Sequence, residues 1–118
     1  MHVQDYCINR LAHEPVEHFV IFCLDNQNRL IGEETMSIGT INQTAVYPRE
    51  VVNAALKHHA RSVILVHNHL SGKAKPSRAN IAVTRDIEEA PTVMGTTLHN
   101  HLIIADTICV SFKSLGHL

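Results

Sequence analysis

The chain has 118 residues, 45% hydrophobic and 18% charged, which predicts a single globular domain over residues 1–118 and excludes a disordered chain. No apolar run approaches the ~20 residues of a membrane span and no signal-peptide pattern opens the chain, so we expect a cytoplasmic protein without a membrane partner. Because the formal net charge is -1 and no basic run is visible, we expect no strong nucleic-acid binding by this domain.

The first half of the chain alternates between helical and extended patterns. Apolar residues at helical spacing open it, and two runs rich in β-branched and aromatic residues follow around a polar turn at 25–28. Pro48 suits the first turn of a second helix. The expected elements are a helix over residues 2–12, strands over 16–24, 29–38 and 39–46, and a helix over 49–60. On that second helix the expected apolar face consists of Val51, Val52, Ala55, Leu56 and His59.

The second half begins with an apolar run, Val63 to Val66, which indicates a buried strand. Ser77 is expected to cap a third helix that ends near Ala90, because Pro91 removes a backbone hydrogen bond. Two closing strands are expected over residues 97–105 and 108–112. The expected fold class is therefore α+β (mixed α/β), with a curved, mostly antiparallel sheet flanked by helices.

His67 and His69 follow the buried strand directly. Residues two apart in an extended chain point to the same side, so both imidazoles should enter one space. Gly72 and Pro76 then interrupt regular structure before the helix start at Ser77. This arrangement predicts a metal site. The alternative interpretation is that His67 and His69 are ordinary polar residues that bind no metal.

A second His-Asn-His-Leu tetrapeptide occurs at residues 99–102. We interpret it as a chance repetition in a chain with ten histidines. The alternative is a ligand role for His99 or His101. Three cysteines without CxxC spacing, Cys7, Cys23 and Cys109, are expected to be reduced and mostly buried.

Several segments together are similar to the C-terminal domain of RadC-type proteins, a bacterial branch of the JAMM/MPN (JAB-like) metalloprotein fold. They are VEHFVIFCLD, GTINQTAVYPREVVNAAL, ILVHNHLSG, KPSRANI, HLIIAD and a final SF, and they occur in order over nearly the whole chain. The resemblance implies a cytidine-deaminase-like architecture. The helix-hairpin-helix segment found in front of this domain in longer RadC proteins has no counterpart in this sequence.

The resemblance also implies a zinc site and a hydrolytic activity on peptide or isopeptide bonds. His67 and His69 match the two imidazole ligands, and zinc would activate a water molecule. Glu17 matches the carboxylate that accepts a proton from that water and passes it to the leaving amine. Ser77 matches the serine that hydrogen-bonds the oxyanion. From the residues alone, Glu14, Glu33 and Glu34 are rivals of Glu17, and helix capping explains Ser77.

This sequence departs from the family pattern at the third metal ligand. Asn80 stands where the pattern has an aspartate, Leu70 replaces a proline, and Asn100 replaces an acidic residue. A neutral amide is a poorer zinc ligand than a carboxylate, so we expect weakened metal binding. Two functions remain open: a zinc-dependent metallopeptidase, impaired at Asn80, that acts on a peptide or protein substrate, or a catalytically inactive module that binds a partner protein.

Overall fold

The protein is described by a computed structural model that covers residues 3–39, 48–70, 81–82, 84–86, 88, 95–106 and 108–116. Its elements, in chain order, are α1 (Val3–Leu11), β1 (Glu17–Leu24), β2 (Leu30–Gly39), α2 (Pro48–Lys57), β3 (Ser62–Asn68), β4 (Thr97–Ala105) and β5 (Ile108–Ser111). Residues 81, 82, 84–86 and 88 are also helical. The strand expected over 39–46 and the helix end expected at Pro91 lie outside the described residues, apart from Gly39, which ends β2.

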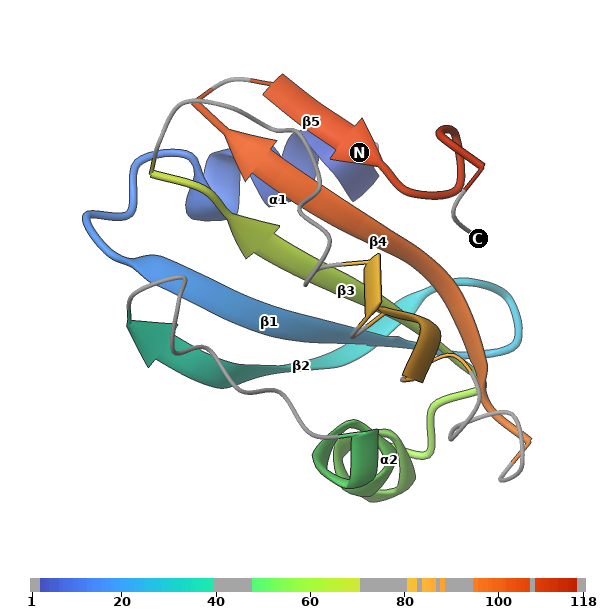
Figure 1. Cartoon of the computed structure of the whole chain (residues 1–118). Helices are drawn as coiled ribbons and strands as arrows, with labels where there is room; N and C mark the ends of the chain where they lie inside the picture. Colours follow the sequence, from blue (N-terminus) through green and yellow to red (C-terminus); the bar gives the residue numbers. More distant parts are fainter. Residues whose placement is uncertain are drawn as a thin grey trace.

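The five strands form one sheet in the order β2-β1-β3-β4-β5 (Figure 1). Neighbouring strands are antiparallel except β3 and β4, which are parallel. Helices accompany this mixed, mostly antiparallel sheet, so the α+β fold class expected from the sequence is confirmed. In the described part of the chain, no helix combines the length and the apolar character needed to cross a bilayer.

The two faces of the sheet carry separate apolar clusters because side chains alternate along each strand. On β1, Phe19, Ile21 and Cys23 pack with residues of α2. The intervening Val20, Phe22 and Leu24 pack with Cys7 and Leu11 of α1. The helices α1 and α2 therefore cover opposite faces, and the apolar stripe expected for α1 is confirmed at its two fully buried residues.

The apolar face predicted for α2 was partly wrong. Val51 and Ala55 are buried as expected, but Ala54 is buried with them, whereas Leu56 is 47% exposed. The helix ends at Lys57, and the following His59 is exposed with a φ of 55°. The buried stripe of α2 therefore consists of Val51, Ala54 and Ala55, which pack in the same apolar cluster as Phe19 and Ile21 of β1.

Candidate metal site at the end of β3

The last residues of β3 bring two imidazoles together, as the sequence predicted. The Nε2 atoms of His67 and His69 lie 2.8 Å apart, and the ring centroids are 4.6 Å apart. Both side chains are buried, at 7% and 8% exposure. The backbone amide of His69 donates to the carbonyl of Ile104, so pairing with β4 continues past the end of β3 and holds the second ring beside the first.

Asn68, between the two histidines, ties this strand end to the start of β1. Its Oδ1 accepts a 2.7 Å hydrogen bond from the amide of His18, and its Nδ2 donates to the carbonyl of Val16 at 3.1 Å. These bonds bracket Glu17. Glu17 is 7% exposed, and its carboxylate lies 3.4 Å from the backbone amide of Leu70, which donates to it. Glu17 is thus brought to the segment that carries His69.

The rival carboxylates are engaged elsewhere. Glu34 Oε1 lies 3.1 Å from the Lys57 ammonium, and Glu33 and Glu14 each lie 3.6 Å from the Arg10 guanidinium. Among these four glutamates, Glu17 is the one with a described contact to the residue that follows His69. The buried position of Glu17 also differs from the solvent-facing position expected of an ordinary strand start.

His101 of β4 joins the cluster from behind His67. Its Nε2 lies 2.9 Å from His67 Nδ1, and its Nδ1 lies 2.6 Å from the Thr84 hydroxyl. His101 is fully buried and Thr84 is 1% exposed. Figure 1 draws the described helical residues between 81 and 88 as short orange segments in front of β3 and β4. Because His101 contacts the nitrogen of His67 that does not face His69, we assign it as a hydrogen-bond partner of His67 and not as a third ligand.

The repeated His-Asn-His-Leu sequence was the signal for His101, although its chance interpretation was the one preferred above. His99, the other histidine of that repeat, is half-buried and its pKa is lowered by partial burial and by Lys113. Nothing in the sequence singled out Thr84, because a lone threonine in a helical pattern has no distinctive spacing.

Aromatic rings enclose the two inner histidines. His67 stacks on Phe19 with centroids 5.4 Å apart and planes inclined by 6°, and His101 stacks on Phe112 at 4.2 Å and 22°. Burial, with smaller contributions from His101 and His69, lowers the pKa of His67 well below its ordinary value. Burial and then His69 lower the pKa of His101 to about 3. Both rings are therefore neutral at neutral pH, the form that ligates metals.

The donor pair fits zinc. Two nitrogens on a tetrahedral zinc with Zn–N bonds of about 2.0–2.1 Å lie about 3.3 Å apart, so the His67 and His69 nitrogens need to separate by only about 0.5 Å from 2.8 Å. The His67–His101 bond is the type of interaction that orients a ligating imidazole. Within the described ranges, no three His, Cys, Asp or Glu side chains are grouped so as to hold a metal ion. The ligand candidate Asn80 and the candidate Ser77 lie outside those ranges.

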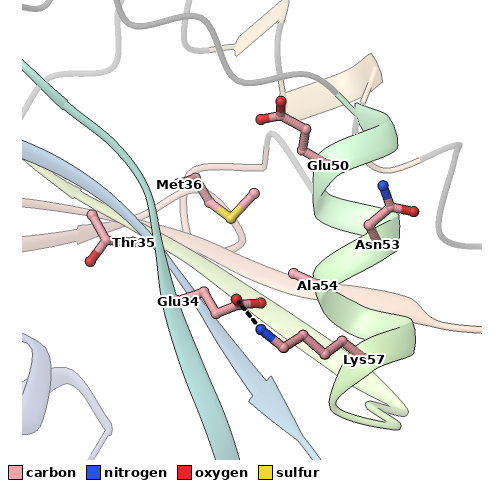
Figure 2. A pocket seen from close by; sticks show the side chains of 7 residues that line it. All are labelled: Glu34, Thr35, Met36, Glu50, Asn53, Ala54 and Lys57. Atoms are coloured by element: carbon pink, nitrogen blue, oxygen red, sulfur yellow. Dashed lines mark hydrogen bonds and ion pairs between the residues drawn. The ribbon is translucent and has the colours of Figure 1, made fainter.

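A separate groove lies between β2 and α2 (Figure 2). It has a volume of about 320 Å³ and is lined by Glu34, Thr35, Met36, Glu50, Asn53, Ala54 and Lys57. Figure 2 shows the Glu34–Lys57 ion pair spanning the groove from strand to helix. Its lining holds none of the clustered histidines, so we assign it no part in the candidate metal site.

A model of the RadC-like JAB domain matches residues 1–117. The chain belongs to the RadC-like JAB domain family. It is 45% identical over 114 residues to a UPF0758 protein of Ruegeria pomeroyi. The alignment covers 97% of this chain and 51% of the relative. A UPF0758 protein of Rhodobacter capsulatus is 46% identical over 114 residues, with 97% and 53% covered. A third, from Marinomonas sp., is 44% identical over 115 residues, with 98% and 51% covered. The chain thus spans about half the length of these RadC-like relatives.

Proposed function

We propose that this RadC-like JAB domain is a zinc-dependent hydrolase of peptide or isopeptide bonds, weakened by Asn80. The observation that carries the proposal is the convergence of His67 Nε2 and His69 Nε2 at 2.8 Å beside a strand end to which Glu17 is tied. Two imidazoles that meet in a buried space, next to a carboxylate, are among the parts that metal-assisted hydrolysis requires.

In this proposal His67 and His69 would hold a zinc ion, and Asn80 would be a neutral third donor. When bound, such an ion would supply the Lewis acidity that activates water at neutral pH. Glu17 accepts the proton of the attacking water and delivers it to the leaving amine. Ser77 donates a hydrogen bond to the oxyanion. The burial of Glu17 and His67 keeps bulk water from competing for these contacts and strengthens the electrostatic interactions between them.

The second candidate function is a catalytically inactive module that binds a partner protein. It is favoured by Asn80 in place of an aspartate, because an amide carries no negative charge. Losing a ligating carboxylate removes negative charge that would hold a dication, and even indirect ligand partners are typically worth ~10–100-fold in metal affinity. The inactive module predicts no hydrolysis under any metal loading.

The deciding experiment measures zinc in untagged protein by elemental analysis, followed by competition titration against a chromogenic chelator. We expect zinc binding by the wild-type chain, its loss in His67→Ala, and an affinity at least ~10-fold higher in Asn80→Asp. Asn53→Asp adds the same charge on the exposed face of α2 and serves as the matched control. Absence of zinc binding at micromolar metal would refute the metal site. An unchanged affinity in Asn80→Asp would refute Asn80 as a donor.

A further inference from the structure

Thr84, His101 and His67 form a continuous chain of hydrogen-bond contacts that ends at the candidate metal site. The links are 2.6 Å from Thr84 Oγ1 to His101 Nδ1, 2.9 Å from His101 Nε2 to His67 Nδ1, and 2.8 Å from His67 Nε2 to His69 Nε2. Three separate parts of the fold contribute to it, namely the helical residues 84–86, β4 and β3.

The protons of this hydrogen-bonded series can be arranged in one of two directions, because a neutral imidazole carries one N–H and one lone pair. If Thr84 accepts from His101 Nδ1–H, then His101 Nε2 is an acceptor and His67 must donate through Nδ1–H. His67 Nε2 is then left with a lone pair toward His69. In the opposite direction Thr84 donates, and His67 carries its proton on Nε2, where no metal can bind.

A general preference of threonine favours the first direction. A threonine hydroxyl in a helix commonly donates its own proton to a carbonyl one turn earlier, which leaves its lone pairs for His101. Packing holds the rings at these partners in either direction, because His67 stacks on Phe19 and His101 stacks on Phe112. Thr84 and His101 are nearly or fully buried, so water does not replace either contact.

We propose that Thr84 and His101 are positioning residues that fix His67 as its Nδ1–H tautomer, with the Nε2 lone pair directed into the site. This hydrogen-bonded series, which we call the relay, is a property of the metal-free protein. Its consequence for metal affinity rests on the proposed function, because it assumes that His67 is a ligand.

The test is long-range ¹H–¹⁵N correlation of the imidazoles in uniformly labelled, metal-free protein, with ring signals assigned through the side-chain carbons. In the wild type we expect protonated (pyrrole-type) nitrogens at His101 Nδ1 and His67 Nδ1, and an unprotonated (pyridine-type) nitrogen at His67 Nε2. An unprotonated His67 Nδ1 in the wild type would overturn the proposal by itself. The proposal therefore stays testable even if a variant fails to fold.

The variants add a second readout. Thr84→Val keeps the β-branched shape and removes the acceptor, so we expect the His67 proton to move wholly or partly to Nε2. Thr84→Ser restores a hydroxyl and should restore the wild-type pattern. Thr96→Val is the matched control, because Thr96 is another buried threonine whose hydroxyl donates outside the cluster, to the carbonyl of Ala60. An unchanged His67 tautomer in folded Thr84→Val would contradict the proposal.

Zinc titration of the same proteins separates this inference from the proposed function. We expect Thr84→Val to weaken zinc binding by ~10–100-fold, with Thr84→Ser and Thr96→Val close to the wild type. If the wild type shows the expected tautomers but binds no zinc, the relay stands and the metal site fails. If zinc binds equally well to Thr84→Val and the wild type, the positioning role fails while the metal site stands.

Discussion

The side chain of Asn68 ties the end of β3 to the start of β1, which lies about fifty residues earlier in the chain. It accepts from the amide of His18 at 2.7 Å and donates to the carbonyl of Val16 at 3.1 Å. The bridge decides where the Glu17 carboxylate lies relative to His67 and His69, because it fastens the residues on both sides of Glu17 to the residue between the two histidines. An asparagine suits this position, since it presents one acceptor and one donor side by side.

We therefore expect Asn68→Ala to destabilise the protein and to disturb the site together. The truncation removes two partly buried hydrogen bonds, to the amide of His18 and the carbonyl of Val16, at a cost of about 1–3 kcal/mol in the free energy of unfolding. Chemical denaturation with circular dichroism measures this change. Asn53→Ala, on the exposed face of α2, is the control and should stay within about 0.5 kcal/mol. Equal stability of the two variants would show that the bridge contributes nothing.

Glu17→Gln tests the proton-transfer role that we propose for this carboxylate. The amide keeps an oxygen that accepts from Leu70, so the contact at 3.4 Å and the fold should survive, whereas proton acceptance is lost. Removing a general base typically lowers turnover by about 10²–10⁴-fold. Zinc-loaded protein and a quenched-fluorescent peptide library provide the measurement, with Glu34→Gln as the control. Activity that is indifferent to Glu17→Gln would rule out this mechanism.

Phe112 stacks on His101 at 4.2 Å and is fully buried, so its removal should affect both stability and site. Phe112→Ala is expected to lower the free energy of unfolding by about 3–5 kcal/mol through lost burial and the cavity that remains. Leu115→Ala, at a side chain that is 52% exposed, should change it by less than about 1 kcal/mol. Thermal and urea unfolding of the three proteins provide the comparison. A small effect of Phe112→Ala would mean that the rings do not form one packed unit.

The thiols are predicted to resist alkylation in the folded protein. Burial raises the pKa of Cys7 to about 12, and burial likewise raises the pKa values of Cys23 and Cys109 to about 11. The reactive thiolate is therefore scarce at pH 8. For Cys7, the fraction in the thiolate form is roughly a thousandfold lower than for an ordinary thiol. Iodoacetamide labelling followed by mass spectrometry should show slow native reaction and fast reaction in guanidinium chloride.

The pH dependence of the iodoacetamide labelling shows whether the pKa of Cys7 is raised in the folded protein. Because the folded pKa of Cys7 lies above the unfolded one, the native rate should keep rising about tenfold per pH unit beyond pH 9, where the unfolded chain reaches its plateau. The same shift means that the buried thiol supports the fold fully below the ordinary thiol pKa, and that this support is lost as the pH rises toward 12. A native plateau near pH 9 would contradict the raised pKa.

The sequence by itself determined most of the helices and strands that the structure describes, and it determined the pairing of His67 with His69. An apolar run predicts a buried strand, and alternation along a strand places residues two apart on one side. Both are local rules, so they hold whatever the rest of the chain does. The resemblance to RadC-type domains singled out Glu17 among four carboxylates, and the fold then placed that residue next to the segment that carries His69.

Only the tertiary structure decided that His101 meets His67. The parallel β3–β4 pairing changes register between Val63 and Ile64, so that Leu65 lies opposite His101. Without that shift Val66 would lie opposite His101, and the imidazole would face the α1 side of the sheet, since a slip of one residue reverses the faces. Periodicity states which side chains share a face within one strand. It does not reveal which strands are neighbours or in which register they pair. Strand order and register together determine that His101 contacts His67.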